Sequence, residues 1–252
     1  MRAWLLAMLW LLSAGTLRAE TLVIAGDLWC PVNCAADAER PGIFVELAQQ
    51  IFAESGIEVE YRVLNWARAV ADTRSGRLGA VIGAGVQDAP DFVFTPTAPG
   101  LSRMCFYALR GDSWRYQGLE SLGQRRLGAI NGYSYGAELD LYLNRHLQSP
   151  QVQLVIGDKA LATNLRKLRR GRVDVLVENA WVMEAVLAER HLFNEIVEVG
   201  CRQGDIPIYL AFSPRLPRSA DYARLFEQGL QRFQADGRLQ ALMSRYGVSS
   251  MR

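Results

Sequence analysis

From residue 21 onward, short apolar runs alternate with segments whose apolar residues recur at helical spacing. Residues 21–26 (TLVIAG) predict a buried strand, and residues 58–64 alternate apolar and polar positions as a strand does. Between them, the apolar residues of 43–52 predict a helix that stops at Gly56. A helix over 66–74 and a strand over 78–83 follow. This order predicts a mostly parallel sheet with helices on its faces.

The same alternation restarts in the middle of the chain. Further strands are predicted over 126–130, 152–156 and 173–177, with helices from about Ser134, over 160–169 and over 181–190. Gly76 and Gly171, which are 95 residues apart, lie in the similar segments RSGRLGAV and RGRVDV. The chain therefore holds two similar α/β units of about a hundred residues each.

Two β-like segments, 103–110 and 206–213, bracket the second unit, and a helical segment over 219–246 closes the chain. If the two bracketing segments are antiparallel crossing strands, the chain enters and leaves the second unit side by side, which makes a hinge. The predicted fold class is α/β with two lobes, each a mostly parallel sheet flanked by helices.

Residues 1–19 have the pattern of a secretory signal, with Arg2, an apolar run and Ala19 before a polar start. We expect cleavage after Ala19 and a periplasmic location. A membrane anchor is disfavoured because it needs about 20 apolar residues and Arg18 interrupts the run. Cleavage removes Arg2 and Arg18 and no acid, which takes the formal charge from +2 to zero. A neutral chain gives no reason to expect nucleic acid or an anionic membrane as a partner.

The chain has four cysteines, an even number that favours disulfides in an exported protein. Cys30 and Cys34 are predicted to pair within one loop, whereas nothing in the sequence shows whether Cys105 and Cys201 are close. A metal pair at Cys30 and Cys34 is disfavoured because no histidine accompanies them. The sequence has no P-loop, HExxH or paired Cys-x-x-Cys pattern, and we expect neither a cofactor nor a metal.

Candidate ligand-binding residues follow the predicted strands, because ligands of open parallel sheets bind beyond the carboxyl ends of the strands. Tryptophans and tyrosines would form the walls, an arginine would bind a carboxylate, and Glu178 would bind an ammonium group. Glycine would allow a backbone to approach the ligand, and exposed amides near Ser134 would favour an anion. The full set is Trp29, Trp66, Arg68, Gly83, Ala84, Gly85, Arg103, Tyr133, Ser134, Tyr135, Glu178 and Asn179.

Each candidate also has a structural interpretation. The tryptophans could belong to the core, Arg68 could be a solvated helix charge, and Ser134 could be a helix N-cap. Asp174 is predicted to be a structural acid at a turn. Residues 132–136 (GYSYG) fit the G-x-S-x-G pattern of an esterase nucleophile, with Asp174 and His191 following in the hydrolase order. The motif is short, however, and His191 falls in a helix-like stretch instead of a loop.

Several segments in a characteristic order resemble the extracellular solute-binding proteins that serve polar amino-acid uptake. They are Asp27–Pro31, Pro41–Ile43, Asn65–Arg68, Arg74–Ile82, Phe94–Pro96, Gly132–Ser134, Gly171–Asp174, Asp236–Leu239 and Tyr246–Gly247. The resemblance implies one lobe of residues 20–103 and 210–252, a second lobe of residues 104–209, and capture of a ligand by hinge closure. It also implies delivery of an amino-acid-like ligand to an ABC-type importer, and we expect a monomer. The second hypothesis is a sensor subunit of the same fold that presents its ligand-bound state to a signalling receptor.

The chain departs from that family at two places. The resemblance implies an arginine for the ligand carboxylate shortly after the third strand, but residues 85–91 contain none. It implies an acid for the ligand amine where this chain has Asn179, beside Glu178. Arg68 or Arg103 would then have to replace the missing cation. The same fold also hosts dehydratases of cyclic acids, for which Glu178 would be the acid or base, so an enzyme is the third hypothesis.

Overall fold

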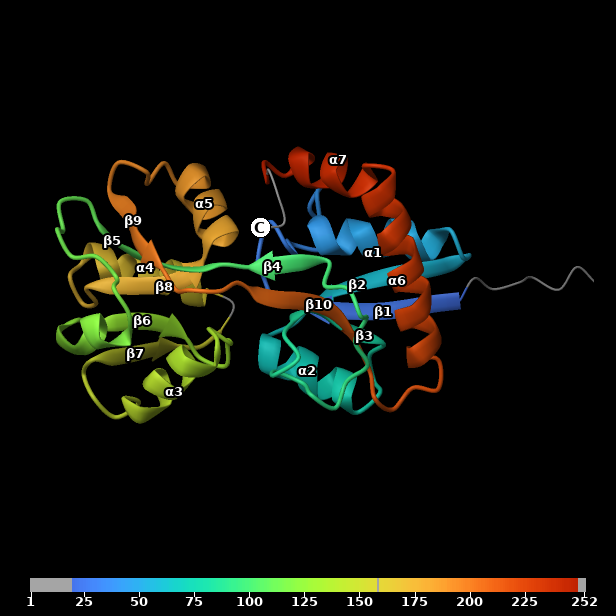
Figure 1. The fold of residues 1–252 in the computed structure, drawn as a ribbon, viewed down its shortest axis with the longest axis horizontal. Coiled ribbons are helices and arrows are strands. Elements are labelled where there is room, and N and C mark those ends of the chain that lie inside the picture. Colours follow the sequence, from blue (N-terminus) through green and yellow to red (C-terminus); the bar gives the residue numbers. More distant parts are fainter. Residues whose placement is uncertain (1–19, 158, 249–252) are drawn as a thin grey trace, which may run out of the picture.

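The protein consists of two lobes joined by two chain crossings, as the computed structural model shows (Figure 1). The structure describes residues 20–157 and 159–248, and the predicted signal segment 1–19 lies outside them. Each lobe has one five-stranded sheet with helices on both faces. None of the helices in the described ranges is both long and apolar enough to span a membrane.

Lobe 1 is built on the sheet β2-β1-β3-β10-β4. Its strands are β1 (Glu20–Gly26), β2 (Ile57–Val63), β3 (Ala80–Ala84), β4 (Gly100–Ser102) and β10 (Ile206–Phe212). Its helices are α1 (Ile43–Ala53), α2 (Trp66–Arg74), α6 (Ser219–Ala235) and α7 (Arg238–Arg245). Strands β1, β2 and β3 are parallel and β10 runs antiparallel to β3. Helices α1, α6 and α7 cover one face, and α2 packs with the other.

The apolar pattern places these elements. Phe44, Leu47, Ala48 and Ile51 share one face of α1 and are buried, because they recur every three or four residues. In β3 the neighbours Val81 and Ile82 point to opposite faces of the sheet and join different cores, as the two-residue period of a strand requires.

Lobe 2 is built on the sheet β7-β6-β8-β5-β9. Its strands are β5 (Met104–Leu109), β6 (Leu127–Ile130), β7 (Val152–Val155), β8 (Val175–Asn179) and β9 (Ile196–Cys201). Its helices are the 3₁₀ helix η1 (Leu119–Gln124), α3 (Ala137–Arg145), α4 (Ala160–Arg169) and α5 (Ala180–Glu189). Strands β6, β7 and β8 are parallel, whereas β5 runs antiparallel to β8 and β9. Helices α4 and α5 share one core, and α3 and η1 pack on the other side.

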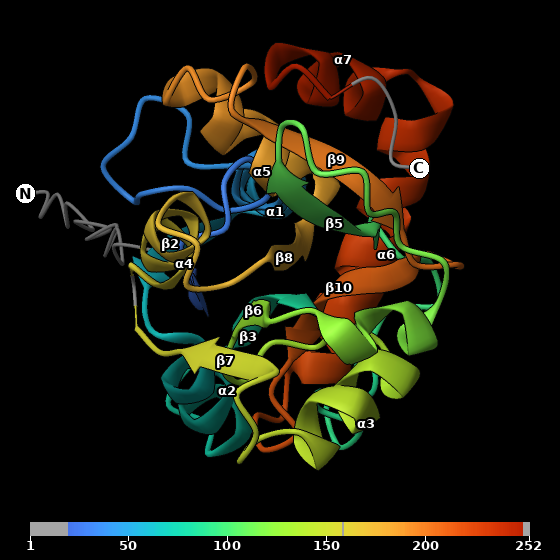
Figure 2. The same cartoon turned by 90° about the vertical axis from the view of Figure 1, so that its left-hand side faces the viewer.

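The two crossings are short and run side by side. Strand β10 pairs antiparallel with β4, which brings Ile206 opposite Ser102. On the lobe 2 side, Cys105 lies opposite Cys201. Figure 2, seen from the lobe 2 side, shows β10 running behind β5 and β9 toward α6. Because all of β10 belongs to the lobe 1 sheet, residues 206–209 lie in lobe 1, which moves the predicted boundary at 209 to about residue 205.

Candidate functional site

The lobe 1 side of the cleft begins where β1 ends. Asp27 and Trp29 lie on the loop that follows Gly26, and a disulfide joins Cys30 to Cys34 in that loop, as predicted. The loop packs against the start of α1 at Gly42. A Cβ at Gly42 would lie 2.5 Å from the Cα of Asn33, and its φ of 123° also favours glycine. The closed ring and this packing hold Trp29 in place, with only 7% of its surface exposed.

The end of β3 supplies the next part of the lobe 1 wall. Gly83 has a φ of 84°, and a Cβ there would lie 3.3 Å from the indole of Trp29, so the tryptophan lies directly over this backbone. The Gly85 N–H donates to Oδ2 of Asp88 at 2.7 Å. Burial raises the pKa of the Asp88 carboxyl, and the hydrogen bonds from Gly85 and Ser134 oppose that shift. Trp66, the first residue of α2, completes this side.

The lobe 2 side begins where β6 ends. Tyr133 and Ser134 lie between β6 and α3, and Ser134 donates to Oδ2 of Asp140 at 3.2 Å. Burial raises the pKa of the Tyr133 phenol, which keeps the hydroxyl protonated as a donor. Helix α3 begins at Ala137, three residues later than predicted, so Ser134 is not its N-cap.

Glu178, near the end of β8, is the most deeply buried acid of the cleft, with 1% of its surface exposed. Its Oε1 accepts from the N–H of Asn179 at 2.8 Å. Its Oε2 is buried and has no hydrogen-bond partner among the described residues. Burial raises the pKa of Glu178 to about 7, although the hydrogen bonds that its carboxylate accepts from Asn179 and Trp29 act to lower it.

Side chains from the two lobes contact each other across the cleft. Trp29 Nε1 of lobe 1 donates to Oε1 of Glu178 at 3.4 Å. In the opposite direction, the Tyr133 hydroxyl of lobe 2 donates to Oδ2 of Asp27. These contacts connect the carboxyl end of β1 with those of β6 and β8.

Two adjoining cavities of about 40 Å³ each lie at this contact. Both are lined by Asp27, Trp29, Trp66 and Tyr133. The first also contacts Ile82, Gly83, Gly85, Asp88, Ser102, Met104, Ser134, Ile206 and Ile208. The second also contacts Leu28, Asn65, Ile130, Asn131, Gly157, Ala160, Leu161, Glu178 and Val182. The pair of cavities is therefore bounded by both lobes and by the crossing strands β4 and β10.

Comparisons with known proteins place this arrangement among solved folds. No family model matches the sequence, and no curated protein matches it significantly. A histidine kinase sensor domain described as similar to periplasmic binding proteins is 24% identical, with a TM-score of 0.75 over 91% of this chain and 96% of that chain. A structure from work on glutathione import through GshT and the cystine ABC importer of Streptococcus mutans is 16% identical, with a TM-score of 0.78 over 93% and 98%.

A third solved structure is an amino acid ABC transporter substrate-binding protein from Streptococcus pneumoniae, bound to L-arginine. It is 17% identical, with a TM-score of 0.71 over 90% of this chain and 94% of that chain. The chain has the two-lobed fold of type II periplasmic binding proteins. This confirms the predicted fold class, and the crossing strands β4 and β10 lie at the junction between its lobes.

Within this binding-protein fold, most of the candidate residues gather at the cleft. Trp29, Trp66, Gly83, Gly85, Tyr133, Ser134 and Glu178 line the two cavities. Ala84 is buried in lobe 1 and Tyr135 in the core of lobe 2, where the Tyr135 hydroxyl accepts from the Ile130 N–H at 2.7 Å. Asn179 is the N-cap of α5 and also donates to Ser102, so both ends of its amide are used in the fold.

The two candidate cations lie elsewhere. Arg68 projects from α2 with 71% of its side chain exposed, and its Nε lies 3.5 Å from Asp72. Arg103 sits between β4 and β5 with half of its side chain exposed, and it donates to Asp205 across the paired crossings. Neither side chain lines the cavities. Arg68 lies in the first turn of α2 and Arg103 lies at the hinge. Both positions direct the charged group to solvent, where each arginine pairs with an acid.

Sequence reasoning missed two acids of the cleft, Asp27 and Asp88. Asp27 directly follows the first strand, and that position was itself a signal for a ligand contact. Asp88 lies beyond the tight turn at Gly85, and its approach to the cavity depends on the hydrogen bond that folds the turn back. The spacing of the sequence does not reveal that bond.

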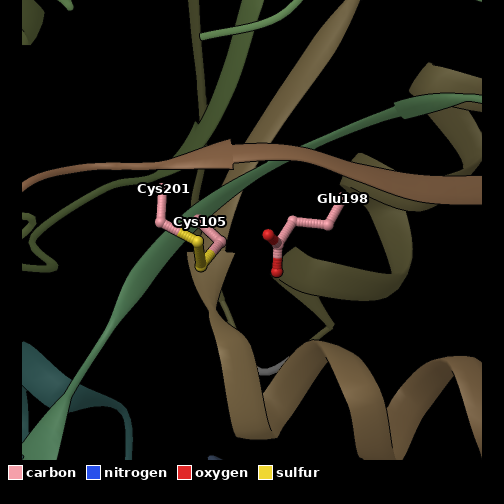
Figure 3. A group of neighbouring side chains, drawn as sticks. All are labelled: Cys105, Glu198 and Cys201. Atoms are coloured by element: carbon pink, nitrogen blue, oxygen red, sulfur yellow. A yellow bond between two sulfur atoms is a disulfide. The ribbon is translucent and has the colours of Figure 1, made fainter. Parts of the chain in front are cut away.

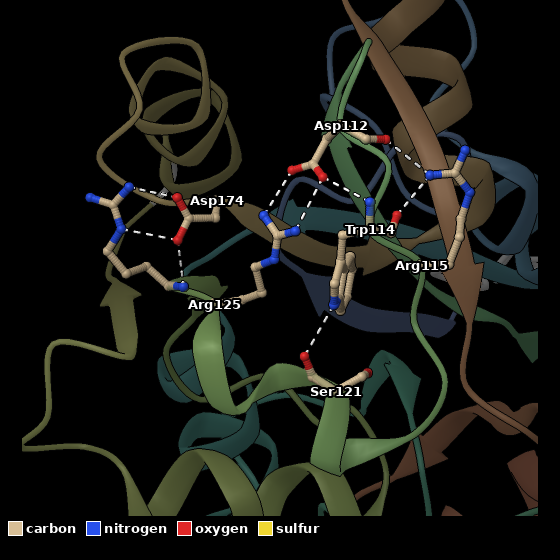
Figure 4. A network of polar contacts seen from close by, with 7 residues as sticks. Asp112, Trp114, Arg115, Ser121, Arg125 and Asp174 are labelled. Carbon is tan, nitrogen blue, oxygen red and sulfur yellow. Dashed lines mark hydrogen bonds and ion pairs between the residues drawn. The ribbon is translucent and has the colours of Figure 1, made fainter.

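The Ser-Asp-His order of the G-x-S-x-G hypothesis does not form a triad. Ser134 follows the carboxyl end of β6, whereas Asp174 precedes β8, which is parallel to β6 and starts at the opposite edge of the sheet. There Asp174 accepts three hydrogen bonds from Arg126, next to the Asp112–Arg125 pair (Figure 4). Asp174 is thus the structural acid that was predicted. His191 follows the end of α5, the helix that leads away from the carboxyl end of β8.

Cys105 and Cys201 form a second disulfide, which answers the pairing left open by the sequence. Figure 3 shows their sulfur atoms bonded, with the Glu198 carboxylate nearby. These three residues are the only group of metal-ligating side chains found in the described ranges. Both thiols are consumed by the disulfide, so the group does not form a metal site in this oxidation state.

Proposed function

We propose that this protein is an exported solute-binding protein that captures a small polar solute between its lobes by hinge closure and delivers it to an ABC-type importer. The observation that carries the proposal is the convergence of strand ends from both lobes on one pair of cavities. In an open α/β sheet this is where ligands bind.

The form of the junction supports capture by closure. Across the cleft, the lobes meet through side-chain contacts such as Trp29–Glu178 and Tyr133–Asp27. The covalent connections are the short segments around Arg103 and around Gly204, whose φ of 74° is accessible to glycine. Cavities of about 40 Å³ hold only a few water molecules, so a solute of amino-acid size enters when the lobes separate.

Several observations support export and solute binding over catalysis. The secretory pattern of residues 1–19 and the two disulfides fit an oxidising compartment. Two of the structural neighbours are connected with ABC import by their own descriptions. These neighbours are binding proteins, and the catalytic triad suggested by the sequence is not assembled. We expect a monomer that meets its importer through the outer surfaces of the closed lobes.

A second candidate is a ligand-sensing role. The observation that favours it is the 24% identity to a histidine kinase sensor domain over 91% of this chain, above the 16% and 17% identities to the transport-related structures. Solute capture would be the same in both roles, and only the protein that receives the closed form would differ. Pull-down with the closed form as bait separates them by recovering a permease or a receptor.

A thermal-shift screen tests the solute-binding role. The protein, refolded to remove bound solute, is screened against amino acids, amines, organic acids and short peptides. A solute at 100 times its Kd adds about 2.7 kcal/mol of stability and raises Tm by a few degrees. Trp66→Ala is expected to abolish the shift, while Arg68→Ala retains it because Arg68 is exposed to solvent. Absence of a shift with every class of compound would overturn the proposal.

A further inference from the structure

The charge of the cleft is one-sided. Asp27 and Asp88 line the first cavity, and Asp27 and Glu178 line the second. No lysine or arginine is among the described residues that line either one. Asp140 adds a fourth carboxylate behind Ser134. A bound anion would face these carboxylates without a compensating lysine or arginine among the described lining residues.

Two basic side chains, Arg202 and Lys159, lie near the cleft but do not line either cavity. Arg202 lines a neighbouring hollow, and its Nη1 donates to the Gly204 carbonyl at 2.5 Å. That hollow shares Gly85, Ser134 and Ile206 with the first cavity, and the positive charge of Arg202 acts to lower the pKa of Asp140. Lys159 stands before α4 and is exposed to solvent.

A second, independent observation concerns Glu178. Its Oε2 is fully buried without a hydrogen-bond donor, although the residue lines the second cavity. A buried acceptor without a partner destabilises the folded protein, and more strongly when it is charged. The carboxylate therefore lacks one hydrogen-bond donor. An N–H group of a ligand in the second cavity would supply it.

The groups that face Glu178 intensify this need. Asp27 lies across the cleft and opposes its ionisation, and the phenols of Tyr107, Tyr133 and Tyr135 around it are neutral. Among the described residues, the indole of Trp29 is the only side chain of the other lobe that donates a hydrogen bond to Glu178. Closure of the lobes thus buries Glu178 in a site where no lysine or arginine is among the described lining residues.

We propose that the solute bound in this cleft is an organic cation that carries N–H donors, an alkylammonium or guanidinium compound, an inference that rests on the proposed solute-binding function. Its N–H groups would donate to Glu178 and Asp27, or to Asp88 at the other end. The indole faces of Trp29 and Trp66 would attract the same positive charge. Because the two cavities adjoin at Asp27 and each has a further acid, a diamine matches both.

Calorimetric titration of the refolded full chain with four probes tests this inference. Putrescine is a dication, L-arginine carries one net positive charge, tetramethylammonium is a cation without N–H, and L-glutamate is an anion. We expect putrescine or L-arginine to bind and to exceed tetramethylammonium and L-glutamate in affinity by about tenfold or more, as charge-assisted hydrogen bonds require. Equal or tighter binding of L-glutamate or tetramethylammonium would overturn the inference.

Matched variants identify the acids involved. Asp27→Asn and Glu178→Gln are each expected to weaken binding of the cationic probe by about tenfold or more. Asp37→Asn, which removes an exposed charge from the same lobe as Asp27, is expected to bind like the wild type. Circular dichroism verifies that each variant is folded, and unchanged affinity in a folded Glu178→Gln variant contradicts the assignment.

The pH dependence provides a second readout. Because a bound cation favours the ionised form of Glu178, affinity for putrescine should rise between about pH 6 and pH 8, and Glu178→Gln should remove that rise. Failure of this inference is distinct from failure of the proposed function. Binding of an anionic or neutral solute in the thermal-shift screen overturns only the cation, whereas no binding by any class overturns both.

Discussion

Glu178 is the acid of the cleft whose pKa is most strongly affected by burial. It is buried at the contact between the lobes, and burial raises its pKa to about 7. In an unfolded chain its pKa would return to the ordinary value of 4.5. The folded protein therefore binds a proton more tightly than the unfolded chain, and the Glu178 contribution to stability is greatest at low pH.

The Glu178→Gln variant tests this at the residue scale. As the pH rises from about 4.5 through about 7, the wild type without added solute should lose stability, by at most about 3 kcal/mol from this group. The variant keeps the shape of the side chain and removes the charge. It should therefore be more stable than the wild type at about pH 8, and its advantage in stability should be smaller at about pH 5. Denaturant unfolding across this pH range measures the difference.

Glu189→Gln is the matched control, because Glu189 ends α5 in the same lobe and is exposed. The control should follow the pH profile of the wild type. If Glu178→Gln also followed the wild-type pH profile, burial would not destabilise the Glu178 carboxylate. That result would contradict a buried, raised-pKa acid in the cleft.

At the residue scale, the sequence predicted the positions of the aromatic side chains of the cleft better than the positions of charged side chains. Trp29, Trp66 and Tyr133 were found because they follow strands or open a helix. Arg68 was expected in the cleft for its chemistry, but the start of α2 directs it to solvent. Asp88 was missed because its position depends on a turn stabilised by Gly85, which no periodicity encodes.

At the scale of elements, the pair β5–β9 is closed by the disulfide Cys105–Cys201, next to both crossings. The cysteines are separated by 96 residues, so the bond closes almost all of lobe 2 into one loop. The Cys30–Cys34 bond, with a separation of 4 residues, closes a small ring beside the cleft. The two disulfides therefore restrict the unfolded chain to very different degrees.

Removing each disulfide tests this difference. In the chain-entropy model, replacing Cys105 and Cys201 by alanine should cost about 4–5 kcal/mol, against about 2 kcal/mol for Cys30 and Cys34. Chemical denaturation of the two double variants measures the costs. Equal losses, or a larger loss from the small ring, would show that the bond across lobe 2 does not stabilise the fold in this way.

The prediction of elements succeeded where the periodicity was long. Helices α2 and α4 have the predicted bounds, and α1 begins at the predicted Ile43 but ends at Ala53, before the predicted stop at Gly56. Strand β9 was not predicted, because it lies at the sheet edge and only Ile196 and Val199 of its six residues are buried, which leaves a short apolar pattern. The late start of α3 reflects Gly136, whose φ of 94° is not helical.

At the scale of the whole molecule, the repeat of two α/β units and the bracketing strands were enough to predict two lobes with a hinge. How the lobes meet could not be predicted, because it depends on pairs such as Trp29–Glu178 that are 149 residues apart in the sequence. Solute capture depends on this meeting of the lobes under the proposed function, because the meeting creates the cleft.

The most direct test is the distance between the lobes, measured by electron paramagnetic resonance between spin labels at Val86→Cys and Ile156→Cys. Both positions are exposed, at 47% and 74%, and lie on different lobes. Added solute from the thermal-shift screen is predicted to shorten the distance and narrow its distribution, because it stabilises the closed form. An identical distribution with and without a solute that demonstrably binds would contradict capture by hinge closure.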